Sequence, residues 1–315
     1  MNQETLMEPI VLKSASGFEE VAIWQPRELN SETPVLILCH GMWATYRRWG
    51  KYGRYFAERG FLVVAPTYRH HYQGNESNER LGKTSIKTYT MDVWCLIRQL
   101  YTGFVVSGFV PNRLPILVGH SMGGPIAQLV ALHVPLTALI LIGSAPVAGD
   151  RIYTDPNYKK YIRKLFLKIL FGKPYLPPFE ALSGYVYNRM PKSEHRAIYE
   201  RAVYESGTAA REILAGSGEG LVKWLCRLSS KPIEIDENLI HCPVLVINGR
   251  QDKVVPLETA ADLALKYSRR DSNVLTELRI FDDFAHWPMC EPPQGNFAGW
   301  EKSADFILNW LKTNT

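Results

Sequence analysis

Short, continuous apolar runs alternate with amphipathic stretches along the first half of the chain. Strands that are apolar on both faces are typical of a parallel sheet covered by helices. Two shorter segments before them, Pro9–Lys13 and Glu20–Gln25, predict an N-terminal hairpin. The apolar runs are Val35–Cys39, Phe61–Ala65, Ile116–Val118 and Leu139–Ile142.

Helical periodicity fills the segments between these runs. The predicted helices span Tyr46–Arg59, Ser85–Tyr101 and Met122–His133. Strands that alternate with helices in this way predict an α/β fold, in which helices flank a mostly parallel central sheet.

The pattern changes after about residue 145, where strand-like runs disappear and prolines interrupt helical stretches. The alternation of strands and helices resumes near residue 233. We therefore predict an α/β core made of residues 1–145 and 233–315, with a helical cap inserted at residues 146–232. The later core elements are the strands Val244–Ile247 and Glu277–Phe281 and the helices Leu257–Tyr267 and Trp300–Leu311.

Charge and hydropathy exclude several classes of protein. The 315 residues include 36 Lys plus Arg and 31 Asp plus Glu, a formal charge of +5, which is mild and gives no indication of nucleic-acid binding. The start of the chain, Met1–Thr5, lacks the basic and apolar regions of a signal peptide, and no apolar stretch reaches the ~18 residues of a membrane span. We expect a cytoplasmic protein, and the sequence does not indicate its oligomeric state.

Cysteine and histidine spacing argues against disulfides and metal. Five cysteines lie far apart and form no C-x-x-C pair, as expected for reduced thiols. The neighbouring His70 and His71 have no second pair at metal-ligand spacing. No metal, nucleotide or organic cofactor is therefore expected, and water is the only co-substrate implied.

The sharpest motif is G-H-S-M-G-G at residues 119–124, which follows an apolar strand and precedes an amphipathic helix. This is the context of a nucleophile elbow, in which a tight turn lifts the oxygen of Ser121 clear of the sheet. Gly119 and Gly123 lack the Cβ atoms that would clash as strand and helix approach. The alternative interpretation is a glycine-rich turn that only packs a helix onto a sheet.

A second motif, H-G-M-W at residues 40–43, directly follows the strand that ends at Cys39. The backbone N–H groups of Met42 and Met122 are predicted to form an oxyanion hole. His40 is expected to hold the loop by hydrogen bonds. Trp43 either lines the pocket or packs beneath the cap.

A nucleophilic serine needs a base and an acid that orients the base. Asp252 and His286 lie on loops that follow two later strands. The chain order Ser, Asp, His is the one found in hydrolases whose serine lies on such a strand-to-helix elbow. Asp282 and Asp283 lie nearer His286 in sequence, but we expect them to fix the loop instead. Three residues beside these motifs are predicted to bind substrate: Trp43, His120 and Trp287.

With these motifs, the sequence resembles the α/β-hydrolase superfamily, most closely bacterial esterase-like members with a helical cap. The resemblance covers roughly residues 9–150 and 233–315 and assigns the triad roles to Ser121, Asp252 and His286. One departure lies after Arg69, where many relatives have glycine and this chain has the pair His70-His71. We expect that pair to be solvated, although contact with a polar substrate is an alternative.

The predicted cap is rich in aromatic residues, of which we expect most to form its own core and a few to face an apolar substrate. The segment Tyr158–Phe171 alternates basic and apolar residues. It is either an ordinary cap helix or a helix that lies on an anionic membrane surface.

The favoured hypothesis is a serine hydrolase that cleaves a carboxylic ester or thioester of an apolar acyl or aromatic small molecule through an acyl-enzyme on Ser121. A C–C bond hydrolase, an acyltransferase or a lyase on the same triad is an alternative, as is a ligand-binding protein without catalysis. Because one fold hosts many reactions, the resemblance alone does not separate them.

Overall fold

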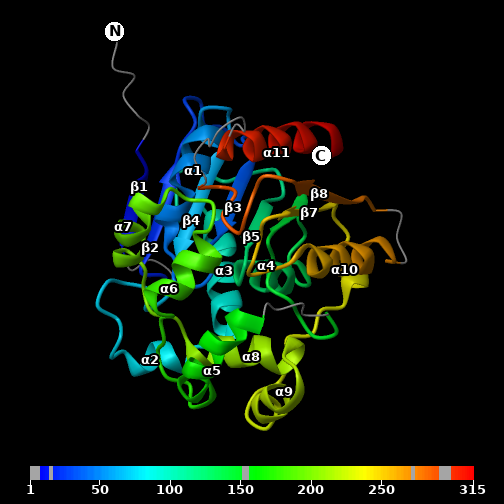
Figure 1. Cartoon of the computed structure of the whole chain (residues 1–315). Coiled ribbons are helices and arrows are strands. Elements are labelled where there is room, and N and C mark those ends of the chain that lie inside the picture. Colours follow the sequence, from blue (N-terminus) through cyan, green and yellow to red (C-terminus); the bar gives the residue numbers. More distant parts are fainter. Residues whose placement is uncertain (1–7, 14–16, 151–155, 271–273, 291–298) are drawn as a thin grey trace.

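The computed structural model describes residues 8–13, 17–150, 156–270, 274–290 and 299–315. They form an α/β fold around an eight-stranded sheet with the order β1-β2-β4-β3-β5-β6-β7-β8 (Figure 1). Strands β4, β3, β5, β6, β7 and β8 are parallel, whereas β1 and β2 pair antiparallel at one edge. The strands are β1 (Ile10–Lys13), β2 (Glu20–Trp24), β3 (Val35–Cys39), β4 (Leu62–Thr67), β5 (Ile116–His120), β6 (Ala138–Ile142), β7 (Val244–Gly249) and β8 (Thr276–Phe281).

The predicted core elements are confirmed, with ends that differ by a few residues. Strand β3 has the predicted limits, and β1 and β2 form the expected hairpin, although its predicted turn at residues 14–16 lies outside the described residues. The predicted helix over residues 46–59 is a short 3-10 turn, Tyr46–Trp49, that continues into α1. The core helices are α1 (Gly50–Ala57), α2 (Glu79–Gly82), α3 (Ile86–Leu100), α4 (Gly123–Ala131), α10 (Leu257–Ser268) and α11 (Trp300–Asn314).

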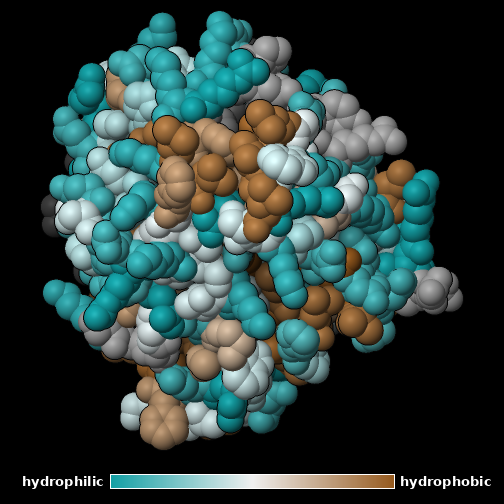
Figure 2. All heavy atoms as spheres, turned by 90° about the horizontal axis from the view of Figure 1, so that it is seen from below, coloured by the Kyte–Doolittle hydropathy of each residue, from teal (hydrophilic) through white to brown (hydrophobic). Residues whose placement is uncertain are grey.

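Helices make up the regular structure of the described residues between β6 and β7. In Figure 1, α5, α8 and α9 lie together below the sheet, and Figure 2 views the molecule from that side. The limits of the predicted cap, residues 146–232, stay a prediction. Its helices are α5 (Pro156–Leu170), α6 (Phe179–Ala181), α7 (His195–Glu200), α8 (Gly207–Ser217) and α9 (Gly220–Arg227).

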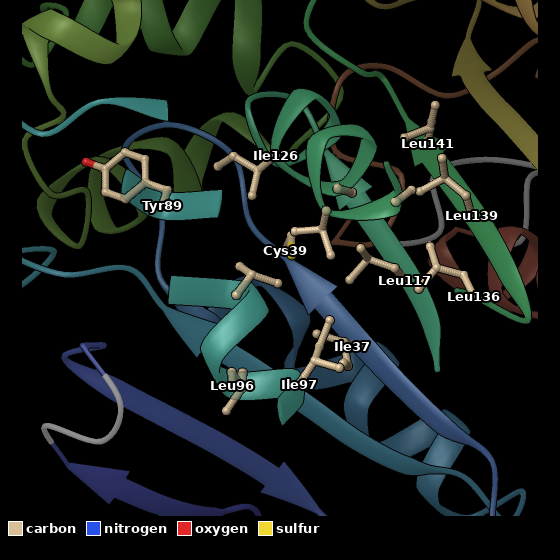
Figure 3. Packing of buried hydrophobic residues seen from close by; sticks show 14 of the residues in the cluster. Ile37, Cys39, Tyr89, Leu96, Ile97, Leu117, Ile126, Leu136, Leu139 and Leu141 are labelled. Carbon is tan, nitrogen blue, oxygen red and sulfur yellow. The ribbon is translucent and has the colours of Figure 1, made fainter. Parts of the chain in front are cut away.

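The sheet has a hydrophobic core on each face. On one face, side chains of β3, β5 and β6 meet α3 and α4, as the sticks of Figure 3 show for Ile37, Leu117 and Leu139 against Ile97 and Ile126. The other core packs α1 and α11 against the sheet and continues into the cap. Apolar strands therefore lie buried between two layers, as a parallel sheet requires.

His70 takes a backbone conformation that favours glycine. Its φ is 67°, in the left-handed region that side chains rarely adopt. The Glu19 carboxylate accepts a hydrogen bond from His70 N (2.7 Å), and Asn75 Nδ2 donates to His70 O (2.7 Å). These contacts hold a histidine in a backbone conformation that favours glycine.

The prediction that His71 is solvated is wrong. His71 is buried and its Nε2 lies 2.9 Å from Oε2 of Glu205, which belongs to the loop before α8. Oε1 of Glu205 accepts hydrogen bonds from Tyr89 Oη (3.1 Å) and Ser206 N (2.7 Å). A buried, fully bonded ion pair thus joins the loop after β4 to the segment that begins α8.

Burial alone lowers the pKa of His71, but the Glu205 carboxylate and its hydrogen bond outweigh burial and raise that pKa above its ordinary value. We expect His71→Leu to lower the free energy of unfolding by about 3 kcal/mol, since it leaves Glu205 buried without its cation. Because a raised pKa stabilises the folded state through protonation, the loss is full below pH about 6.5 and shrinks as the pH rises through the folded-state pKa.

Denaturant unfolding of both proteins at acidic, neutral and alkaline pH measures this difference. Glu79→Gln is the matched control, because the exposed Glu79–Lys173 ion pair also joins a core helix to the cap segment. We expect no change for that variant. A loss for His71→Leu that is constant across pH would show that His71 is neutral in the folded protein.

Candidate active site

Ser121 occupies a strained turn between β5 and α4. Its φ is 51°, in the left-handed region. Ser121 N donates to Ile142 O (3.1 Å) at the end of β6, and Ser121 O accepts from Gly124 N and Ala145 N (both 2.9 Å). The turn is therefore held from β6 and from the first turn of α4, as a nucleophile elbow requires.

The two glycines that flank this turn are needed for close approach. A Cβ on Gly119 would lie 2.4 Å from the carbonyl oxygen of Gly123, and one on Gly123 would lie 2.3 Å from that of Cys39. Both obstacles are backbone atoms, which cannot swing away. The predicted reason for glycine at these positions is confirmed.

Asp252 and His286 form a buried pair on the loops after β7 and β8. His286 Nδ1 lies 2.8 Å from Asp252 Oδ2. The other carboxylate oxygen accepts hydrogen bonds from the backbone N–H groups of Val254 and Val255, both at 2.8 Å. Three donors thus fix the carboxylate, and it in turn orients the imidazole ring with its proton on Nδ1.

The end of β6 brings this pair next to the elbow. Gly143 follows Ile142, whose carbonyl binds Ser121 N, and a Cβ on Gly143 would lie 3.2 Å from Asp252 Oδ2 and 3.4 Å from His286 Nδ1. Serine, imidazole and carboxylate therefore gather at the carboxyl ends of neighbouring strands, where sites of open α/β sheets form.

The H-G-M-W loop lies against the elbow. A Cβ on Gly41 would come within 2.8 Å of Ser121 Cβ. His40 holds the loop as expected: its Nδ1 donates to Gly41 O (2.8 Å) and its Nε2 accepts from Tyr68 N (3.2 Å). Burial lowers the pKa of His40 well below its ordinary value, so the ring is neutral and can play both roles.

A cavity of about 150 Å³ opens beside Ser121. Met42 and Met122 both line it, and within the described part of the chain neither backbone N–H donates to a protein acceptor. Trp43 lines it as well, which favours the first of its two predicted roles. The lining residues are Met42, Trp43, Ser121, Met122, Ala145, Pro146, Ile169, Tyr175, Ala210, Ile213, Leu214, Val254, Val255, Pro256 and Thr259.

His120 and Trp287, which the sequence predicts to bind substrate, are not among the residues that line this cavity. His120 is buried, and its Nε2 donates to the carbonyl of His286 (2.7 Å). Burial and the neighbouring His286 hold the pKa of His120 well below its ordinary value. Trp287 packs against Tyr187 and the Arg48 guanidinium. Both residues position the loop that carries His286.

The cap contributes mainly aliphatic side chains to the cavity. Among the described aromatic residues of the predicted cap, Tyr175 alone lines the cavity, and its hydroxyl donates to Met42 Sδ (3.1 Å). Ile169, Ile213 and Leu214 were not predicted to line the cavity, because their helical spacing indicates a buried face without showing what covers it. Residues 254–256 were not predicted either, although their position just after Asp252 was a signal that could have identified them.

The aspartates near His286 behave as predicted. Asp282 pairs with Arg250 (2.6 Å) and Asp283 with Lys302 (3.3 Å), so both are engaged at the surface. Neither carboxylate contacts the His286 ring in the described structure.

Comparisons with known proteins bear on the family and the fold. A family model described as "Serine aminopeptidase, S33" matches residues 30–293. The chain is 22% identical over 313 residues to a Mycoplasma genitalium protein named "Putative esterase/lipase 2", covering 93% of this chain and 94% of that protein.

Two solved structures are similar over nearly the whole chain. One is an esterase from Exiguobacterium antarcticum, with 16% identity, a TM-score of 0.60 and coverage of 96% of this chain and 98% of that one. The other is a 2-hydroxy-6-oxo-6-phenylhexa-2,4-dienoate hydrolase from Rhodococcus, with 19% identity, a TM-score of 0.59 and coverage of 97% and 99%. At these identities the likeness shows the fold.

The glycine geometry leads to a stability test. We expect Gly119→Ala to lower the free energy of unfolding by about 1–3 kcal/mol or more, since the added methyl meets backbone. Gly50→Ala is the control, because Gly50 has helical φ and ψ and a Cβ there meets nothing within 4 Å. We expect that variant to be unchanged or up to about 1 kcal/mol more stable. Equal thermal stability of the two variants would contradict the close approach.

Proposed function

The chain belongs to the serine aminopeptidase S33 family of α/β-hydrolases, and we propose that it is a serine hydrolase that cleaves a carboxylic ester or thioester with an apolar acyl group. The observation that carries this proposal is the buried Asp252–His286 pair beside the elbow of Ser121, which lines an apolar cavity. Family membership alone does not select the reaction.

In the proposed mechanism, Ser121 Oγ attacks the substrate carbonyl carbon while His286 Nε2 takes its proton. The carbonyl electrons move to oxygen, and the backbone N–H groups of Met42 and Met122 stabilise the oxyanion. The oxyanion collapses, the bond to the leaving group breaks, and His286 protonates that group. Water then repeats the sequence on the acyl-enzyme, while Asp252 keeps the imidazole in the required tautomer.

The lining of the cavity supports an ester or thioester rather than a peptide with a free amino terminus. An aminopeptidase must bind the ammonium group of its substrate, and a carboxylate is the usual partner for such a charge. No aspartate or glutamate lines the cavity among the described residues. The aliphatic cap side chains Ile169, Ile213 and Leu214 instead suit an acyl chain.

The size of the cavity limits the acyl group. Its volume of about 150 Å³ is close to that of an engineered apolar cavity that binds benzene. We therefore propose that short acyl chains occupy it.

The first test is hydrolysis of p-nitrophenyl butyrate. We expect Ser121→Ala to abolish hydrolysis of this ester. Asp252→Asn should lower kcat about 10⁴-fold, because the amide stabilises the wrong tautomer of His286. Asp282→Asn is the matched control and should keep wild-type activity. Undiminished turnover by a folded Ser121→Ala protein would show that Ser121 is not the nucleophile.

The second test changes the cavity in opposite directions. We expect Ala210→Leu to lower kcat/KM for the butyrate ester about tenfold relative to the acetate ester, since the added methyl groups fill the acyl site. Ile213→Ala should move the preference toward longer chains. A series of p-nitrophenyl esters measures both shifts. Chain-length profiles that stay at the wild-type optimum in both variants would exclude this cavity as the acyl site.

A further inference from the structure

The net positive charge of the protein lies in the cap segment. Residues 146–232 contain 15 lysines and arginines against 8 aspartates and glutamates, a formal +7, whereas the whole chain carries +5. The rest of the chain is therefore slightly negative. Charge separated in this way gives one side of the molecule a positive potential that attracts anionic surfaces.

Helix α9 presents an apolar face to solvent. Leu221, Trp224 and Leu228 follow the i, i+3, i+7 spacing of one helix face, and they are 68%, 57% and 66% exposed. The opposite side of the helix packs against α8, with Cys226 buried. Exposed apolar residues on one turn after another are unusual on a monomer surface and mark an interaction site.

The end of α5 has the same character. Leu167 and Phe171 are 66% and 69% exposed, and the exposed Lys164 and Lys168 share their helix face. Ile169 points the other way and lines the cavity beside Ser121. The predicted basic amphipathic pattern is therefore present here with apolar residues on its solvent side, although the side chains of Tyr158, Lys159 and Ile162 lie outside the described residues.

Arg211 forms hydrogen bonds to the end of α5 and to the segment just after α9. Arg211 of α8 donates from Nε to Ser230 Oγ (2.7 Å), just after α9, and from Nη1 to Leu170 O at the end of α5. Figure 2 views the molecule from this side and shows brown apolar groups among teal hydrophilic ones. We define Leu167, Phe171, Leu221, Trp224 and Leu228 as the apolar cap face.

We propose that the apolar cap face docks onto a membrane containing anionic phospholipid. Leucine, phenylalanine and tryptophan enter the interface between headgroups and acyl chains, while the lysines beside them extend to the phosphates. A second copy of this chain is a less suitable occupant, because a symmetric contact would bring two caps of +7 together. This proposal does not depend on the reaction proposed for Ser121.

Docking would place the cavity near apolar molecules that are dissolved in the membrane. Helices α5 and α8 line the cavity with Ile169, Ala210 and Ile213, and the exposed end of α5 belongs to the apolar cap face. An apolar substrate held in the membrane would thus lie close to the helices that line the cavity beside Ser121.

Co-sedimentation with vesicles tests the proposal. We expect the wild-type protein to bind vesicles of phosphatidylcholine mixed with phosphatidylglycerol, to bind pure phosphatidylcholine much less, and to dissociate at high salt. Lys164→Gln with Lys168→Gln should weaken binding about 25-fold, at about fivefold for each charge. Trp224→Ser with Leu228→Ser should weaken it about tenfold or more.

Phe104→Ser is the matched control. Phe104 is 82% exposed but lies before β5, at the opposite end of that strand from Ser121, so its loss should leave vesicle binding unchanged. Hydrolysis of a soluble short-chain ester and thermal unfolding show whether each variant is folded. Thermal unfolding gives this answer even if the protein cleaves no ester.

Two results would overturn membrane docking. One is equal vesicle binding by the wild type and by Trp224→Ser with Leu228→Ser. The other is a wild-type protein that does not bind anionic vesicles. If light scattering then shows a dimer that the same two substitutions dissociate, the apolar cap face belongs to a second copy of the chain.

Discussion

The close approach of β5 and α4 at Ser121 is the constraint on which the rest of the site depends. With no side chain at Gly119 or Gly123, the backbone of the turn comes within van der Waals contact of the helix start and of β3. Ser121 is held there in a left-handed conformation by backbone bonds to Ile142, Gly124 and Ala145. The position of the serine is therefore fixed by the sheet itself, and strain of this kind persists only where surrounding structure enforces it.

The same strand ends position the other groups. Gly143, which follows β6, lies against the Asp252–His286 pair, and Gly41, two residues after β3, lies against Ser121. His120 precedes the serine and binds the carbonyl of His286, so one strand holds both the nucleophile and the loop of its base. In each of these contacts one partner is a backbone atom, so its position follows from the strand end or loop that carries it.

Local patterns were sufficient to predict the strands, the longer core helices and the motifs, whereas the short helix α2 was not predicted. The apolar run at 35–39 gives β3 its observed limits, and the strand–G-x-S-x-G–helix context places Ser121 correctly on its turn. What the sequence could not provide is the direction of a side chain. His120 and Trp287 adjoin the motifs but do not line the cavity, and His71 contacts Glu205, which is 134 residues distant. Contacts of that kind follow from how the cap packs, which no local periodicity encodes.

Labelling with a fluorophosphonate probe, followed by peptide mass spectrometry, tests the central claim most directly. The probe reacts with a serine that an adjacent imidazole activates, and it needs no knowledge of the substrate. We predict one adduct per chain, located on Ser121, and none in the His286→Ala variant. A folded protein that takes up no probe, or that carries the adduct on another residue, would contradict the assignment of Ser121 as the nucleophile.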